Sequence, residues 1–127
     1  MERSQTVLEL RLILNLKATE NQSDIERFQN DTIRPIIKFQ HEVILALVFN
    51  HKFYEKSVKS SNTPDEYRSA LQSFLNGQKE LRHQLIGLVI GLFDLSEFEA
   101  YQLNAPEYQR RIIQIISQRV FDTIGTK

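Results

Sequence analysis

The sequence predicts an all-α fold: a single-domain bundle of five to six helices over residues 1–127, with a long apolar central helix. Three observations support this prediction. A capping pattern, in which a polar residue is followed three positions later by glutamate, occurs several times along the chain. Apolar residues recur at three-to-four spacing through most of the sequence, as they do on one face of a helix. No second segment offers the alternating pattern that a strand would need in a partner.

The composition is that of one globular domain, and it counts against several classes of function. Hydrophobic residues make up 41% of the 127 residues and charged residues 25%. The formal net charge is +0, whereas proteins that bind nucleic acid non-specifically usually carry a basic excess. The chain has no cysteine, which excludes disulfides, thiolate metal sites and cysteine nucleophiles. The longest apolar block, residues 85–95, is about half of the ~20 residues that a membrane span needs. With no export signal at the amino terminus, we expect a cytoplasmic protein of bacterial type with no membrane partner.

Residues 1–22 form an amino-terminal segment whose structure the pattern leaves open. Five of its leucines alternate with other residues, as in a half-buried strand; they are Leu8, Leu10, Leu12, Leu14 and Leu16. A lone strand leaves its backbone groups unpaired unless it pairs with the same strand of a second chain. We expect a helix over residues 6–18, because leucine and lysine favour helices. Strand pairing across a dimer is the alternative, and the segment is a candidate for dimerisation.

Two helices are predicted in the middle of the chain, with a bend between them. A capping pattern at Ser23 and Glu26 predicts a short helix from Asp24. Pro35 has no N–H group, so we expect a break or bend over residues 30–35. The central helix is predicted over residues 33–59, whose apolar residues recur at helical spacing and include the unbroken apolar run 43–49. A helix that is apolar on all sides is usually surrounded by neighbours.

The remaining helices are predicted over residues 64–75, 78–93, 97–103 and 105–123. Capping patterns precede three of them, at Thr63 with Glu66, Ser96 with Glu99, and Asn104 with Glu107. Gly87 and Gly91 lie four residues apart on one face of the helix over residues 78–93. Glycine costs about 1 kcal/mol in a helix interior, so we expect another backbone to pass close to this face. A glycine-lined contact with a ligand or a second copy is the alternative.

One candidate ligand site lies inside the predicted bundle. Gln40 and His41 interrupt an apolar helix, and a polar group there needs a partner or must point outward. One hypothesis is that these two residues line a small inner cavity that faces Gln84 or Tyr101. We favour the other interpretation, which places His41 at a helix edge with one hydrogen bond.

No catalytic set and no cofactor is predicted, and we do not expect an enzyme. His41 and His51 are ten residues apart on one helix, so they point in different directions and cannot share a metal. Glu80 and His83 form one Glu-x-x-His step, but the bundle metal sites that use this step need a second copy, which is absent. We therefore predict no metal site.

A helix-turn-helix unit is a further alternative, over the last two predicted helices. Arg110, Arg111 and Arg119 would then contact phosphates. The long second helix has an isoleucine stripe typical of a bundle core, and Glu97, Glu99 and Glu107 would repel DNA, so we do not favour this reading.

Several stretches resemble an uncharacterised family of short all-helical proteins from Bacteroidetes-type bacteria. They are residues 28–30 with 32–40, residues 81–82 with 85–91, and residues 110–113. The resemblance extends over residues 25–122. It implies a helical fold and no established activity.

The function predicted first is that of a non-catalytic structural or protein-interaction domain, and the expected assembly is a homodimer. The reason is a surplus of apolar residues beyond what one small core needs; it comprises the stretch Leu8–Leu16 together with Phe49, Phe53 and Phe93. A large exposed apolar patch marks a site for a partner. A small-molecule-binding protein or enzyme is the second hypothesis, and a nucleic-acid binder is the third.

Overall fold

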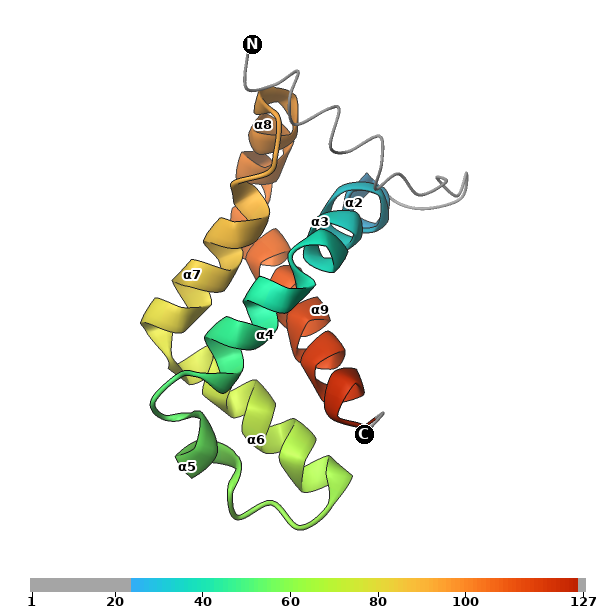
Figure 1. The fold of residues 1–127 in the computed structure, drawn as a ribbon. Coiled ribbons are helices and arrows are strands. Elements are labelled where there is room, and N and C mark those ends of the chain that lie inside the picture. Colours follow the sequence, from blue (N-terminus) through green and yellow to red (C-terminus); the bar gives the residue numbers. More distant parts are fainter. Residues whose placement is uncertain (1–23, 126–127) are drawn as a thin grey trace.

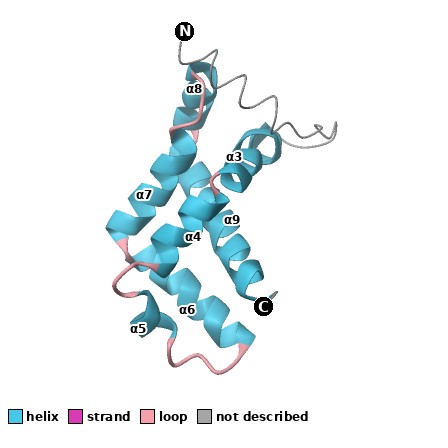
Figure 2. Cartoon of the chain, in the orientation of Figure 1, coloured by secondary structure: helices cyan, strands magenta, loops and turns pink. Residues whose placement is uncertain are grey.

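The computed structural model describes residues 24–125, and every regular element among them is helical (Figures 1 and 2). The first three elements, α2, the π-helix η1 and α3, follow one another without a break and form one continuous helix. The described residues thus form seven separate helices, so the all-α prediction is confirmed and the count of five to six is too low. The elements are α2 (Asp24–Phe28), η1 (Gln29–Ile33), α3 (Arg34–Phe39), α4 (His41–Phe49), α5 (Tyr54–Val58), α6 (Pro64–Gly77), α7 (Lys79–Ile90), α8 (Leu95–Leu103) and α9 (Ala105–Gly125).

The long central helix over residues 33–59 is not formed. The chain turns at Gln40, between α3 and α4, and again over residues 50–53, between α4 and α5. At the second turn the ring nitrogen Nδ1 of His51 accepts a hydrogen bond from the backbone N–H of Phe53 at 3.1 Å. A side chain that satisfies a backbone donor in this way competes with the helix. The apolar pattern of residues 43–49 does not reveal that a side-chain hydrogen bond will end the helix after it.

The bend predicted near Pro35 is a change of helix type rather than a break. In η1 the backbone N–H of Arg34 donates to the carbonyl oxygen of Gln29, five residues earlier. Pro35 follows in the first turn of α3 and is buried. A proline ring clashes with the carbonyl four residues before it in a regular α-helix. The wider π turn gives this ring room, so the helix continues through it.

The core lies between α9 and the helices packed against it. Its fully buried side chains come mainly from α3, α4, α6, α7 and α9, and the largest include Ile36, Ile44, Leu75, Leu85, Ile112 and Ile116. Burying a side chain of this size stabilises the fold by roughly 1.5–3 kcal/mol relative to exposure. In Figure 1, α9 passes behind α4 and runs along α6. The helical face predicted for residues 105–123 is therefore the buried one.

The capping patterns locate some helix starts and misplace others. Thr63 Oγ1 accepts from the backbone N–H of Glu66 at 3.1 Å, as predicted. The box predicted at Ser96 is wrong, because Asp94 caps α8 instead and exchanges hydrogen bonds with Glu97 at 2.7 and 2.9 Å. Ser23 lies outside the described residues, as do residues 1–22 and the structure predicted for them. The last predicted box fails too, because Glu107 turns toward two arginines.

The close backbone approach predicted at Gly87 and Gly91 is also wrong. A Cβ atom added at Gly87 would meet no neighbouring heavy atom within 4 Å, apart from its own helix backbone. Helix α7 ends at Ile90, so Gly91 is its C-cap rather than an interior residue. Both glycines are exposed, and no packing groove forms over them.

Candidate functional site

The four residues of the predicted ligand cavity are not brought together. Gln40 donates from Nε2 to the backbone oxygen of Leu88 at 3.2 Å, toward α7. His41 faces the other way, toward Arg119 on α9. Gln84 is exposed on α7. The structure therefore does not show a cavity shared by Gln40, His41, Gln84 and Tyr101: two of them face different helices, Gln84 is exposed and Tyr101 is buried. His41 lies at the start of α4 with a hydrogen bond to Arg119, as the other interpretation of this residue predicts.

The surroundings of Tyr101 are those of a core residue. Its side chain is buried, and its hydroxyl accepts a hydrogen bond from Nε2 of Gln109 at 2.8 Å. Its ring lies 5.8 Å from that of Phe93 and 6.2 Å from that of Tyr108, centroid to centroid. Phe28 packs against the same two rings and thereby ties α2 to the end of the bundle. These contacts account for Tyr101 as part of the core.

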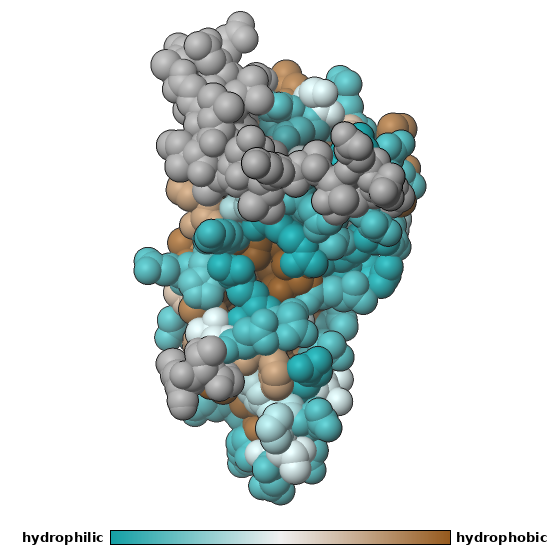
Figure 3. Space-filling model, turned by 90° about the vertical axis from the view of Figure 1, so that its right-hand side faces the viewer, coloured by the Kyte–Doolittle hydropathy of each residue, from teal (hydrophilic) through white to brown (hydrophobic). Residues whose placement is uncertain are grey.

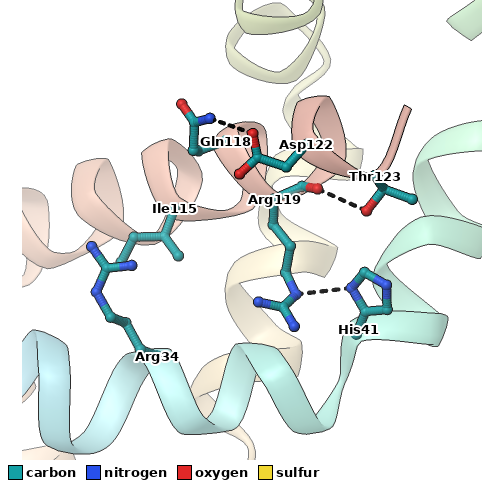
Figure 4. A pocket seen from close by; sticks show the side chains of 7 residues that line it. All are labelled: Arg34, His41, Ile115, Gln118, Arg119, Asp122 and Thr123. Atoms are coloured by element: carbon teal, nitrogen blue, oxygen red, sulfur yellow. Dashed lines mark hydrogen bonds between the residues drawn. The ribbon is translucent and has the colours of Figure 1, made fainter. Parts of the chain in front are cut away.

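A polar pocket lies between the α3–α4 region and α9 (Figure 4). Its volume is about 450 Å³, and its lining residues are Arg34, His41, Ile115, Gln118, Arg119, Asp122 and Thr123. Figure 3 views the side of the molecule toward which α3 and the end of α9 lie, and shows a hollow with an apolar floor and a hydrophilic rim. Sequence reasoning assigned His41 and Arg119 to two different hypotheses. The structure joins them, and adds Arg34, which had no distinguishing sequence signal.

The hydrogen bond in this pocket fixes the state of His41. Nε of Arg119 donates to Nδ1 of His41 at 2.8 Å. A guanidinium has no acceptor atom, so Nδ1 must carry a lone pair and the ring proton must lie on Nε2. His41 is thus neutral in this arrangement, and Arg119 keeps its full positive charge.

Neither arginine of the pocket has a carboxylate partner among the described residues. Arg34 donates from Nε to the amide oxygen of Asn30 at 2.9 Å. Asp122, the acidic residue of the lining, accepts from Nε2 of Gln118 at 2.7 Å. In Figure 4 this pair stands on the other side of α9 from His41. The pocket therefore presents two guanidinium groups that no carboxylate of residues 24–125 contacts through a hydrogen bond or ion pair, and one carboxylate, that of Asp122.

The two other arginines of the helix-turn-helix hypothesis are paired with an acid. Oε1 of Glu107 lies 2.6 Å from Nη2 of Arg110 and 2.8 Å from Nε of Arg111. Hydrogen bonds from Arg110, then from Arg111, lower the pKa of Glu107 from 4.5 to about 2. Arg111 also donates to Oε1 of Gln29 at 2.9 Å, which ties α9 to η1. These arginines serve the fold locally and do not share a surface pocket with Arg119.

An exposed apolar surface lies elsewhere, along α3 and α4. We call it the α3–α4 stripe; it consists of Phe39, Val43, Ala46 and Leu47. Phe39 is 51% exposed and Val43 is 48% exposed, four residues apart. An apolar groove of about 350 Å³ continues the stripe toward α7, lined by Val43, Ala46, Leu47, Asn50, His51 and Gln84.

Only one of the three phenylalanines that the sequence predicts as exposed apolar surplus is exposed in the structure. Phe93 is 2% exposed and belongs to the core, so it is not surplus. Phe49 is half-buried and packs edge-on against Tyr54. Phe53 is exposed, with the amine of Lys52 lying 5.1 Å from its ring centroid. Spacing alone would not have found the stripe, because Phe39 lies three residues after the buried Ile36 and Val43 directly precedes the buried Ile44.

Comparisons with protein-family models, curated proteins and solved structures found no significant match. The resemblance to a Bacteroidetes-type family therefore stays a prediction. Within residues 24–125 no three or more acidic or histidine side chains are grouped so that they could hold a metal ion. Over the same range, no helix combines the length and apolarity needed to cross a bilayer. The functional argument rests on this chain's own contacts and surfaces.

Proposed function

We propose that this chain is a non-catalytic protein-interaction domain that self-associates, and that two copies meet through the α3–α4 stripe. The observation that carries the proposal is the exposure of Phe39 and Val43, each about half exposed, on either side of the turn at Gln40. Single exposed apolar residues are ordinary, but neighbouring ones that continue into an apolar groove mark an interaction surface. A bacterial, cytoplasmic location belongs to the same proposal.

The position of the stripe makes it available to a partner. The same helices also carry Ile36, Ile37, Ile44 and Val48, all fully buried against the rest of the bundle. The stripe is therefore displayed by a rigid support, not by a loop. Removing its apolar surface from water contributes roughly 25 cal/mol per Å². A second helix laid along it would gain that energy without rearranging the core.

The charges beside the stripe favour a second copy of this chain as the partner. Lys38 and Glu42 are both exposed and lie four residues apart next to Phe39 and Val43. A two-fold interface requires a surface that is complementary to itself. If the two-fold axis passes near Gln40, antiparallel copies place Lys38 of each against Glu42 of the other. Opposite charges at the edge of an interface fix its register.

The amino-terminal segment is a second possible contributor to the dimer. Its leucine-rich residues 8–16 lie outside the described part of the chain, so their predicted role in dimerisation stays a prediction. The nucleic-acid hypothesis is less well supported than self-association. Arg110 and Arg111, which that hypothesis needs as phosphate contacts, are both engaged by Glu107.

Sedimentation velocity over a range of concentrations tests the proposal. We expect the wild-type chain to sediment as a dimer and Val43→Glu as a folded monomer. A charge buried without a partner costs about 3 kcal/mol or more, which corresponds to a dissociation constant roughly two orders of magnitude higher.

Leu103→Glu is the matched control for this experiment. Leu103 is 83% exposed on α8, so the same change of leucine or valine to glutamate there should leave the dimer intact. Circular dichroism establishes that both variants keep their helices. A wild-type chain that stays monomeric at the highest concentration, or equal dissociation of both variants, contradicts the proposal.

A further inference from the structure

We infer that the pocket lined by Arg34, His41 and Arg119 binds a small organic anion through an oxyanion group, a phosphate or a carboxylate. The two arginines would supply the charged donors, and His41 would be the positioning residue for Arg119. This inference does not depend on self-association, because the pocket opens between the α3–α4 region and α9.

The charge balance of the pocket favours an anion. Two guanidinium groups, from α3 and from α9, line one hollow, and no carboxylate among the described residues accepts a hydrogen bond from either. Like charges that line one pocket repel each other more strongly as water is removed. Asp122, the carboxylate of the lining, bonds to Gln118 instead, so the two arginines outnumber the acid. At the start of α9, by contrast, Glu107 contacts both Arg110 and Arg111. A bound oxyanion would balance the remaining positive charge of the pocket.

The second argument is the fixed orientation of Arg119. Its Nε–H is held by Nδ1 of His41 at 2.8 Å, so the guanidinium plane is held before a ligand arrives. The remaining N–H groups of the fork are left to donate, in the planar geometry that matches a carboxylate or phosphate. Because the partner is a neutral ring, the bond orients Arg119 without neutralising it. An acidic partner would have done both.

The third argument is size. A volume of about 450 Å³ exceeds the space that an inorganic ion fills, and lies within the range of small-molecule sites. Ile115 adds an apolar surface to the lining, beside the charged groups. Asp122 limits the total charge that the pocket can accept, but its paired oxygen faces Gln118. The fit is to a small molecule with one oxyanion group and an apolar part.

Nuclear magnetic resonance of the full chain tests this inference with three probes: inorganic phosphate, acetate, and chloride at equal ionic strength. We expect saturable shifts of the Arg34 and Arg119 Nε–H signals and of the His41 ring nitrogens with phosphate, with acetate, or with both. The probe that saturates identifies the oxyanion class. Shifts that are no larger than those with chloride, for both oxyanions, overturn the inference.

Variants locate the binding and separate it from a general charge effect. Arg34→Gln should weaken binding about tenfold or more, since a hydrogen bond to a charged group contributes roughly 1.5–3 kcal/mol. Arg34 is exposed and bonds only to Asn30, so this variant should fold normally. Arg110→Gln removes an equal charge at the other end of α9 and should leave binding unchanged. Equal weakening by both variants overturns the inference.

The positioning role of His41 has its own readout. In His41→Asn the amide oxygen can still accept from Nε of Arg119, so binding should be retained. In His41→Leu no acceptor remains, and binding should weaken about tenfold while the fold survives. The ring nitrogens of the wild-type chain should report a proton on Nε2. If the asparagine variant binds as poorly as the leucine variant, His41 does not act by orienting Arg119.

Discussion

Helix α9 and the α3–α4 region are both rich in isoleucine and valine, yet they use these residues differently. The apolar stripe of α9 is covered along its whole length; its buried members are Tyr108, Ile112, Ile113, Ile116 and Val120. The α3–α4 region has one buried face, with Ile36 and Ile44 at its centre, and a second apolar stripe that remains half exposed. One apolar stripe is buried when it packs against one core. A second stripe on the same helices leaves water only if another surface covers it.

The charged residues of the two regions differ in their partners. At the start of α9, Glu107 pairs with both Arg110 and Arg111, whereas Arg34 on α3 bonds, among the described residues, to the neutral Asn30. Near its other end, α9 supplies Arg119 to the pocket that Arg34 also lines. The apolar stripe thus belongs to α3 and α4, while the oxyanion pocket is shared between that region and α9.

The largest expected effect comes from the buried faces, where the two regions should behave alike. Ile116→Ala on α9 and Ile44→Ala on α4 should each lower the free energy of unfolding by about 3 kcal/mol, because each leaves a cavity at a fully buried site. Urea denaturation measures this loss. A loss below about 1 kcal/mol at Ile44 would break the comparison, since α4 would then not share the core.

Val43→Ala is the matched variant on the exposed side of α4. At concentrations where the chain is monomeric, it should change the free energy of unfolding by less than about 0.5 kcal/mol, as surface substitutions usually do. At higher concentrations the same variant should weaken the dimer. A large loss in the monomer would mean that the stripe is covered by the chain itself.

These outcomes bear on how much of the fold the sequence could predict. The amphipathic period of residues 105–123 was read correctly because one face of α9 decides its position. The same period failed over residues 33–59, because a hydrogen bond from the backbone N–H of Phe53 to Nδ1 of His51 and a turn at Gln40 divide the helix. Local competition of this kind is not visible in an apolar pattern.

The next largest change in the free energy of unfolding is expected at Gly87 on α7. Since a Cβ atom at Gly87 meets no neighbour, Gly87→Ala should raise the free energy of unfolding by about 1 kcal/mol, the helix propensity difference. Thermal or urea denaturation measures the gain. Destabilisation would instead reveal a close contact at this face, such as one with a second copy, and would restore the packing role predicted from the sequence.

The smallest expected effect is the contribution of Glu107 to the pH dependence of stability. The pKa of Glu107 falls from 4.5 to about 2 on folding, mainly through the hydrogen bond from Arg110. A lowered carboxyl pKa stabilises the fold above the unfolded value of 4.5, and this contribution is lost as the pH falls from 4.5 toward 2. The free energy difference between wild type and Glu107→Gln should therefore shrink over this range. The effect is small because the pair is exposed and screened by salt.

The titration of the Glu107 carboxyl carbon measures this shift directly. A midpoint near 2 is expected in the wild type, and Arg110→Gln should move it back toward 4.5. A wild-type midpoint at 4.5 would mean that the ion pairs do not persist in solution.

The candidate sites were less predictable from the sequence than the fold. His41 and Arg119 are 78 positions apart, and only the packing of α9 beside α4 joins them. Gln40 and His41 are adjacent in the chain but face different helices, because the chain turns at Gln40 and His41 begins the next helix. His41 was a correct candidate from the sequence, but it does not share a cavity with Gln40.

Spin labels at single introduced cysteines test the α3–α4 interface most directly, because the chain has no cysteine of its own. A label at Lys38, beside the stripe, should show a short distance to the same label in a second copy, measured by pulsed electron paramagnetic resonance. A label at Gln102 on α8 should show a longer distance in the same dimer. Absence of any intermolecular signal at Lys38, or a shorter distance at Gln102, would contradict the assignment of the stripe as the surface through which two copies meet.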